Sequence, residues 1–171
     1  MHISAYQNPR RELPAPNTGH LRSSAMLAVF IILTFLAPLL GAGMDMSGWY
    51  MDLRKPSWAP APGVFGPVWT VLYLLMGIAA WGVWQRAGWT RALIPWAVQL
   101  VLNAVWTPVF FGLHQPGWAF ADILALWLAI AATIIAFARI RLWTAWMMAP
   151  YLAWVTFAAF LNFTIWRMNS P

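Results

Sequence analysis

Five long apolar stretches constrain this chain more than any other feature of its 171 residues. They run roughly over Ser24–Met44, Gly66–Gln85, Arg91–Gly112, Trp118–Ala138 and Leu142–Trp166. Each has about 20 residues or more, enough for a helix rising about 1.5 Å per residue to cross a hydrocarbon layer of about 30 Å. A membrane strand needs only about 9 to 11 residues of alternating polarity, a pattern that these stretches lack. The sequence therefore predicts an all-α integral membrane protein, a five-transmembrane-helix bundle.

The composition supports this class and excludes several others. The chain has 10 Lys and Arg, 4 Asp and Glu and 62% hydrophobic residues, a mixture that leaves no charged shell for a water-soluble globule. Its basic residues lie at the ends of the apolar stretches, where they anchor to lipid headgroups. The net charge of +6 therefore indicates the lipid bilayer as partner and no nucleic acid. Cysteine is absent, which excludes disulfides and thiolate chemistry.

The distribution of Lys and Arg predicts an orientation in the membrane. The side that holds the N-terminus carries Arg10, Arg11, Arg22, Arg86, Arg91, Arg139 and Arg141, and the opposite side carries Arg54, Lys55 and Arg167. Cytoplasmic loops of membrane proteins are enriched in basic residues. For a multi-pass protein of a bacterial inner membrane this places the N-terminus in the cytoplasm. An outer membrane or an organelle would require a different assignment.

The chain divides into a tail and one membrane domain. Residues 1–23 lack the apolar core of a signal peptide and read as a disordered polar tail. Residues 24–171 form the five-helix domain, whose first connection, residues 45–65, is unusually long for a connection between spans. It contains WYMDLRKPSWAPAPGVF, with prolines at 56, 60 and 62 that lower the entropy of holding it in one place. We predict that it folds back over the bundle as a lid.

Polar and aromatic residues recur on one face of the third stretch. Trp96, Gln99, Asn103, Trp106 and Phe110 are spaced three or four apart, so they share a helix face. The two amides need partners within the hydrocarbon layer. Either they bond across helices as packing contacts, or they face a ligand. The position of Asn103 favours contact with a ligand, because this residue lies in the half of the membrane beneath the lid.

The second and fifth stretches bring further residues to that depth. Trp69 and Tyr73 share a face of the second stretch, and Trp154, Ala158 and Asn162 share a face of the fifth. Aromatic rings can stack on a flat ligand while amides and a phenol fix its orientation, and a small residue leaves room for it. The alternative is that these tryptophans belong to the interfacial aromatic belts, where most of the 14 tryptophans are expected.

Catalytic and metal-binding patterns are not found in the sequence. No Ser-His-Asp set, paired carboxylates or phosphate-binding glycine loop is present, so no catalytic residue and no metal site is predicted. His114 stands alone and could at most be an axial haem ligand. Asp122 is the one acid within a span, where it either interacts with the helix dipole or pairs with Arg54, Lys55 or His114. Small residues at Ala121, Ala125, Ala129 and Thr133 permit close helix approach, in a dimer or within the bundle.

The motifs of the chain from Trp49 to Asn169 resemble those of the TspO/MBR family, which includes the tryptophan-rich sensory proteins of bacteria and the translocator protein (peripheral benzodiazepine receptor) of mitochondria. The matching pieces are WY followed by KPSWAPAPGVF, then PVWTVLYLLMG, QLVLNAVWTPVFFG, APYLAW and LNF. The Asn-x-x-Trp-x-Pro-x-Phe-Phe-Gly run, Asn103 to Gly112, is the most specific of these.

The resemblance implies a five-helix bundle, commonly a homodimer, that binds porphyrins such as protoporphyrin IX and haem, and in animals cholesterol and synthetic ligands. Such proteins are implicated in tetrapyrrole transport, sensing, sequestration or breakdown. No cofactor is required, since porphyrin or haem would be the ligand. The expected function is binding of a planar hydrophobic ligand under the lid. The alternative is a light-dependent enzyme that degrades protoporphyrin IX, and this rests on the resemblance alone.

Together, position and resemblance predict one ligand-binding set. Its members are Trp49, Tyr50, Pro56, Trp58, Phe65, Trp69, Tyr73, Gln99, Asn103, Trp106, Trp154, Ala158 and Asn162. One departure from the family concerns sterol: the fifth stretch ends in LNFTIWR, which lacks the tyrosine of the cholesterol motif. This weighs against sterol binding.

Overall fold

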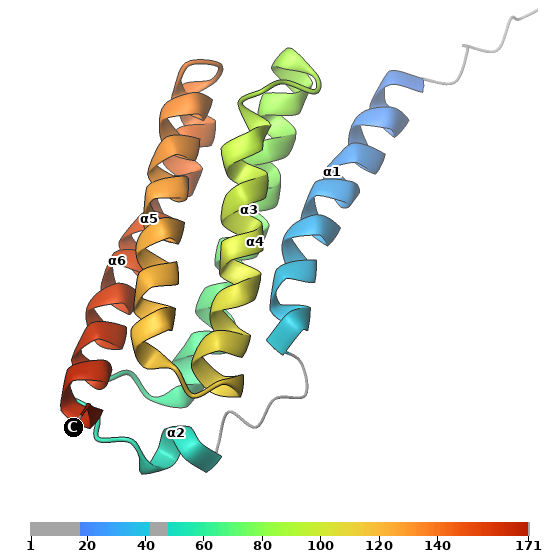
Figure 1. Ribbon diagram of the computed structural model, residues 1–171. Helices are drawn as coiled ribbons and strands as arrows, with labels where there is room; N and C mark the ends of the chain where they lie inside the picture. The colour runs from blue at the N-terminus through green and yellow to red at the C-terminus, as the bar shows by residue number, and fades with distance from the viewer. Residues whose placement is uncertain (1–17, 42–47, 171) are drawn as a thin grey trace, which may run out of the picture.

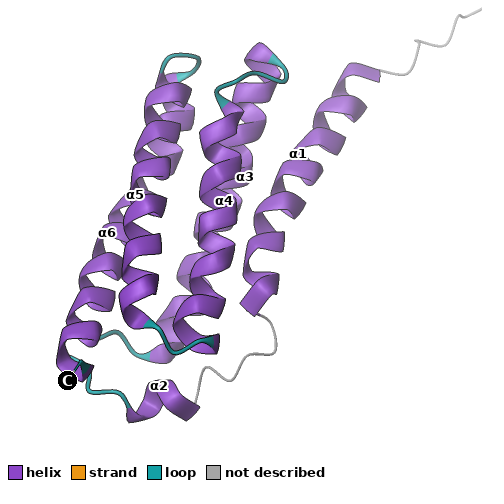
Figure 2. Ribbon diagram, viewed as in Figure 1, coloured by secondary structure: helices purple, strands orange, loops and turns teal. Residues whose placement is uncertain are grey.

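A computed structural model describes residues 18–41 and 48–170 of the chain. Its elements are α1 (Thr18–Leu36), η1 (Ala37–Gly41), α2 (Gly48–Asp52), η2 (Pro62–Val64), α3 (Phe65–Ala87), α4 (Leu93–Thr107), η3 (Pro108–Gly112), α5 (Pro116–Ala138) and α6 (Leu142–Asn169). Within these residues, five helical segments are long and apolar enough to cross a membrane, which confirms the predicted fold class. Figure 2 shows helices and loops alone for the described part. The predictions for residues 1–17, 42–47 and 171 lie outside the described residues.

The long helices run side by side, and the short α2 lies across one end of them (Figure 1). We call this end of the bundle the lid end. The other end, where α1 begins, is called the opposite end. Around the bundle, α1 packs on α3, α3 on α6, α6 on α5 and α5 on α4, and η1 returns to contact α4. The helices α3 and α4 are antiparallel and consecutive, yet they contact each other only sparsely. The bundle is therefore a ring in which consecutive spans are neighbours except at α3 and α4, where α3 packs on α6 and α4 packs on η1.

α1 begins at Thr18, within the segment that the sequence assigned to the polar tail. Two hydrogen bonds hold this early part of the helix against α3. The Trp81 indole Nε1 donates to the carbonyl oxygen of Ser23 at 2.9 Å, and the Gln85 amide Nε2 donates to the Ser23 hydroxyl at 2.8 Å. Polar partners on α3 thus hold Ser23, which lies just before the apolar stretch, against the bundle.

Small residues allow the helices to approach one another closely in the middle of the bundle and at its opposite end. A Cβ atom added to Gly77 of α3 would lie 3.0 Å from the Cα atom of Ile31, so the backbones of α1 and α3 nearly touch there. Ala79, Ala80 and Val83 follow on α3 and are 0% exposed. Glycine and alanine let helix backbones approach closely in a membrane, where van der Waals packing replaces the hydrophobic effect.

α4 changes its winding before it reaches the lid end. The segment Pro108–Gly112 is a π-helix, and the backbone N–H of Leu113 donates to the carbonyl oxygen of Pro108 at 2.9 Å. Proline has no N–H to continue the α-helical pattern, and π turns often occur at functional sites. This wide turn places Phe110 and Phe111 beneath the lid.

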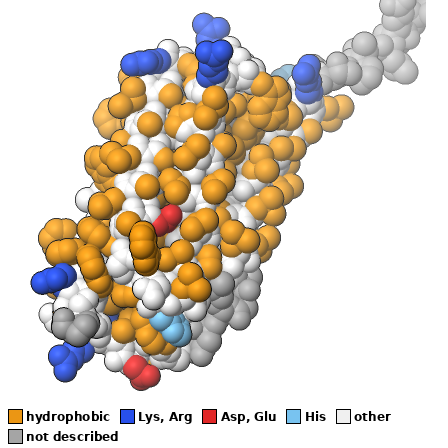
Figure 3. Space-filling view, in the orientation of Figure 1, with side chains coloured by type: hydrophobic (Ala, Val, Ile, Leu, Met, Phe, Trp, Pro, Cys, Tyr) orange, Lys and Arg blue, Asp and Glu red, His pale blue; other side chains and the backbone are white. Residues whose placement is uncertain are grey.

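The surface fits a membrane location. Figure 3 shows hydrophobic side chains along the flanks of the bundle, with Lys and Arg gathered at its two ends. Exposed side chains such as Leu128, Ile135 and Phe160 are apolar, at 64%, 56% and 68% exposure, as a lipid-facing surface requires. The protein is therefore an integral multi-pass membrane protein.

Candidate ligand-binding site

A cavity of about 730 Å³ lies at the lid end of the ring. Its walls come from α3, α4, η3, α5 and α6, with η1 on one flank and the lid across the end. The volume falls in the range of small-molecule sites, roughly 300 to 1,000 Å³. Residues from the lid-end halves of α3 and α4, two helices that contact each other only sparsely, line this cavity.

Most of the predicted ligand-binding residues line this cavity. They are Tyr50, Phe65, Trp69, Tyr73, Asn103, Trp106, Trp154, Ala158 and Asn162. They come from the lid and from three different helices, α3, α4 and α6. Trp49, Pro56, Trp58 and Gln99 of the predicted set are not among the lining residues.

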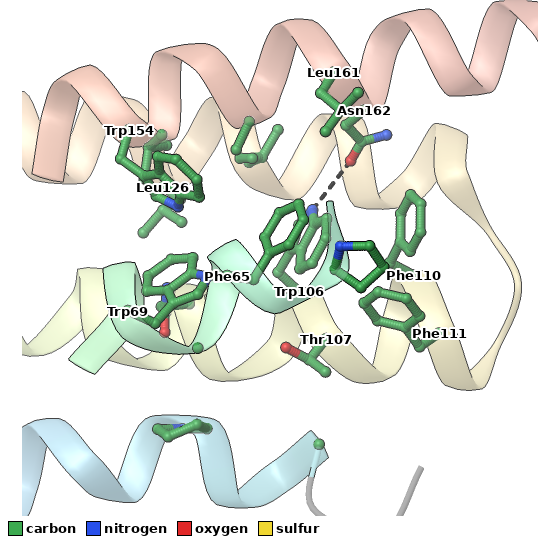
Figure 4. Close-up of a pocket in the computed structure, with 18 of the residues that line it drawn as sticks. Phe65, Trp69, Trp106, Thr107, Phe110, Phe111, Leu126, Trp154, Leu161 and Asn162 are labelled. Carbon is green, nitrogen blue, oxygen red and sulfur yellow. Dashed lines mark hydrogen bonds between the residues drawn. The ribbon is translucent and has the colours of Figure 1, made fainter. Parts of the chain in front are cut away.

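Aromatic pairs form the walls of the cavity (Figure 4). The Trp69 ring stacks on Tyr73 with centroids 5.4 Å apart, and the Trp106 ring stacks on Phe110 at 4.9 Å. Phe65, at the start of α3, meets Trp154 of α6 edge on at 5.8 Å. Rings that are held by other rings have few alternative rotamers, so these walls offer flat, preformed surfaces.

A tyrosine and an asparagine provide the buried polar group of the cavity. The Tyr73 hydroxyl donates to Asn103 Oδ1 at 2.9 Å, and both side chains are buried. In this arrangement the oxygen end of the Asn103 amide accepts from Tyr73, and the donor end, Nδ2, is left for another partner. The cavity therefore has a hydrogen-bond donor at a fixed position among apolar walls.

Asn162 has a structural role in positioning a wall of the cavity. Its Oδ1 accepts a hydrogen bond from Trp106 Nε1 at 3.1 Å, and its Nδ2 donates to the carbonyl oxygen of Pro116 at 2.8 Å. One side chain of α6 thus connects α4 with the first turn of α5. Because both ends of this amide are engaged by the protein, Asn103 is the better placed of the two amides to bind a ligand.

The lid is stabilised within itself by Lys55. The ammonium Nζ donates to the carbonyl oxygens of Tyr50, Met51 and Leu53 at 2.5, 3.1 and 3.2 Å. It also lies over the Tyr50 ring, 4.7 Å from its centroid. A cation at the carbonyl end of a short helix satisfies its free acceptors and its dipole, so this residue closes α2 into a compact turn.

Tyr50 is the main lid residue that faces the cavity from α2. Its ring meets Phe111 at 5.6 Å and Phe110 at 6.3 Å, so the lid rests on the π-helical turn η3. Burial raises the pKa of the Tyr50 phenol above its ordinary value, which keeps the hydroxyl protonated at neutral pH. The phenol can therefore act as a hydrogen-bond donor.

The predicted residues that do not line the cavity have other surroundings. Trp49 packs on Phe110 at 5.6 Å and stacks on His114 at 4.4 Å, which supports α2 from outside. Trp58 is 45% exposed and meets Phe157 edge on at 5.9 Å. The Pro56 carbonyl accepts the N–H of Ala59 in a turn.

Gln99 lies one helical turn from Asn103 on α4, toward the opposite end. It is 0% exposed, and neither atom of its amide has a hydrogen-bond partner within the described residues. Cross-helix packing bonds, which the sequence allowed for Gln99, are therefore not seen. Its amide lies in a packed part of the bundle, away from the cavity wall.

The sequence missed the contributions of the first and fourth spans. Phe35, Pro38 and Gly41 line the cavity from α1 and η1, and Ile123 and Leu126 line it from α5. These residues are apolar members of uniformly apolar stretches, so no pattern marked them. Phe110 and Phe111 also line the cavity, and Phe110 does share the face of Asn103 and Trp106.

Asp122 does not form an ion pair with Arg54, Lys55 or His114, which the sequence allowed as one of two interpretations. Its Oδ2 is buried without a hydrogen-bond partner in the described part of the chain. The Lys55 ammonium binds lid carbonyls and the His114 ring stacks on Trp49, which leaves Asp122 without either. Within the described residues, no group of three or more His, Asp or Glu residues could hold a metal ion.

The fold and the cavity together define a class: a multi-pass membrane bundle with an apolar, ring-lined site under a lid. The family model for the TspO/MBR family matches residues 25–167. This chain belongs to the TspO/MBR family, as its motifs predicted. The match includes α1, which the motifs did not cover.

Several named proteins are similar to this chain over most of its length. A tryptophan-rich sensory protein of Cereibacter sphaeroides is 42% identical over 144 residues, 81% of this chain and 91% of the relative. Protein CrtK of Rhodobacter capsulatus is 38% identical over 151 residues, 86% of this chain and 94% of the relative. The human translocator protein is 43% identical over 126 residues, 71% of this chain and 75% of the relative.

Proposed function

We propose that this protein binds a porphyrin, such as protoporphyrin IX or haem, or a related planar hydrophobic molecule in the cavity beneath the lid. Binding there would serve tetrapyrrole transport, sensing or sequestration. The observation that carries the proposal is the cavity itself, whose stacked rings surround a buried Tyr73–Asn103 hydrogen bond. Membership of the TspO/MBR family supports a ligand-related membrane role.

The chemistry of the walls supports a flat ligand with acceptors at its edge. Trp69, Trp106 and Phe65 present ring faces or edges, which interact well with a conjugated macrocycle. Asn103 Nδ2 and the Tyr50 hydroxyl are donors, suited to a carbonyl or carboxylate oxygen. Ligand sites of this type are largely apolar with a few fixed polar groups that set orientation.

A binding titration in the dark tests the proposal. Purified protein in lipid nanodiscs is titrated with protoporphyrin IX while tryptophan fluorescence is followed. Asn103→Leu removes the fixed donor and should weaken binding about tenfold, the usual value of a buried hydrogen bond. Gln99→Leu is the matched control, because it makes the same change one turn away on the same helix without touching the cavity. Absence of saturable quenching in the wild type, or equal effects of the two variants, would contradict the proposal.

A second candidate function is light-dependent breakdown of protoporphyrin IX. Three indoles, those of Trp69, Trp106 and Trp154, line the cavity, and Trp154 Nε1 has no hydrogen-bond partner within the described residues. An indole at that position could pass one electron to a photoexcited macrocycle. Illumination of the complex separates the two functions. Breakdown is indicated if the porphyrin absorption bands disappear in the wild type and persist in Trp154→Phe. Storage is indicated if the bands persist in both proteins.

We also propose a homodimer in a bacterial cell membrane, with the N-terminus in the cytoplasm if this is the inner membrane. Arg86, Arg91, Arg139 and Arg141 at the opposite end support this orientation.

Ala121 and Ala125 of α5 are exposed and leave space for a second helix, whereas Thr133 is buried and bonds its own backbone. A four-residue repeat drifts around a helix of 3.6 residues per turn, so its members do not all face one way. Crosslinking in native membranes tests the dimer.

A further inference from the structure

The last turn of α6 fastens the lid. Asn169 Nδ2 donates to the carbonyl oxygen of Arg54 at 2.9 Å, and the backbone N–H of Arg54 donates to Asn169 Oδ1 at 2.9 Å. The side-chain amide therefore pairs with one lid residue in both directions. Asn169 Nδ2 also donates to the carbonyl oxygen of Ile165 at 2.7 Å, which holds the side chain against its own helix.

The same helix lines the cavity that the lid covers. Ile165, which anchors the Asn169 amide, is a lining residue of α6, and Tyr50 and Met51 are lining residues of the lid. Asn169 itself is not a lining residue. It can therefore act on the position of the lid without contacting a ligand.

Movement of the lid as one unit is consistent with its internal bonds. The three hydrogen bonds of Lys55 are to carbonyl groups of the lid itself, so they need not break when the lid lifts. The Asn169–Arg54 pair joins the lid to the bundle and must break. Aromatic contacts also join the lid to the bundle, namely those of Trp49 with Phe110 and His114, of Tyr50 with Phe111 and of Trp58 with Phe157, and these must separate as well.

We propose that Asn169 is a latch, which sets how often the lid leaves the cavity and hence how fast a ligand enters and leaves. The effect of Asn169 on lid opening stands on the geometry, and its effect on ligand exchange rests on the proposed function. The two bonds are exposed to solvent. Bonds of this kind shift a two-state equilibrium by about tenfold, so the lid is held shut but is not locked.

Hydrogen exchange of the lid amides tests the latch without any ligand. Asn169→Leu removes both hydrogen-bonding groups at similar size and should speed exchange at residues 49–61 about tenfold. Ser170→Ala is the matched control, because the Ser170 hydroxyl donates to the backbone carbonyl oxygen of Trp166 in α6, at 2.7 Å, and not to the lid. Equal exchange of the lid in the two variants and the wild type would overturn the latch.

Stopped-flow mixing with protoporphyrin IX tests the consequence for ligand exchange. In Asn169→Leu, the association and dissociation rate constants should both rise about tenfold, with Kd within about twofold of the wild type. Unchanged rate constants with a faster-exchanging lid would overturn the control of ligand exchange. A weaker Kd with an unchanged association rate would show that Asn169 contacts the ligand, which also overturns it. If the wild type binds no protoporphyrin IX, the proposed function fails, and amide exchange alone decides the latch.

Discussion

The two ends of this bundle are packed in opposite ways by the same helices. At the opposite end, Ala79, Ala80 and Val83 of α3 are 0% exposed and the neighbouring helices close on them. At the lid end, α3 carries Phe65, Trp69 and Tyr73, whose rings meet the rings of other helices and surround a cavity of about 730 Å³. Small residues allow backbones to approach, whereas stacked rings hold them apart. One helix can thus be both a packing element and the wall of a site.

The sharpest test of this contrast is the same substitution at each end. Ala80→Leu inserts three carbon atoms into a filled core and should destabilise the protein by about 3 kcal/mol. Ala158→Leu points into the cavity and should cost less than about 1 kcal/mol, because the space is already there. Thermal unfolding in detergent, followed by circular dichroism, measures the difference. Similar losses in the two variants would mean that the lid end is as tightly filled as the opposite end.

A second test uses two glycines of α3. Gly77→Ala places a Cβ atom 3.0 Å from the Ile31 backbone and should cost about 2 kcal/mol, because α1 must move away. Gly66→Ala at the lid end meets nothing within 4 Å and should be neutral or slightly stabilising. The midpoint of thermal unfolding gives both values. A neutral Gly77→Ala would show that α1 is loosely packed on α3.

The two amides of α4 provide a third test. Asn103→Leu leaves the buried Tyr73 hydroxyl without its acceptor and should destabilise the protein by about 1 to 2 kcal/mol. Gln99→Leu removes an amide that has no partner within the described residues and should stabilise it by about 1 kcal/mol. Unfolding in denaturing detergent distinguishes the signs. A loss of stability in Gln99→Leu would mean that this amide is satisfied in the membrane.

The smallest expected effect concerns the support of a cavity wall. Trp106→Phe keeps a ring beside Phe110 but removes the hydrogen bond to Asn162 Oδ1, at a cost of about 0.5 to 1.5 kcal/mol. Trp127→Phe is the control, since it removes an exposed indole bond to Thr156 on the outer surface. Protoporphyrin IX affinity should fall in the first variant alone. Equal affinity in both would show that Asn162 does not position the wall.

Much of the site could be predicted because helical spacing and depth are properties of the sequence. Asn103 and Trp106 share a face of one helix, and Tyr73 and Ala158 lie at the same depth on two others, so their convergence followed from the pattern. The position of Trp49 did not, because no helix was predicted within the lid, so no register indicated whether the Trp49 ring points inward or toward His114. Gln99 illustrates a related limit: it shares the face of Asn103, but one turn of depth separates the cavity from the packed core.

The sequence by itself determined the membrane class, the five spans and the faces of the second, third and fifth spans that carry rings and amides, because length, hydropathy and periodicity are local properties. The tertiary structure alone decided the order of helices around the ring, the contributions of α1 and α5 to the cavity and the pairing of Asn169 with Arg54. These depend on contacts between residues far apart in the chain, and in a membrane such contacts are selected by fit between surfaces that are all apolar.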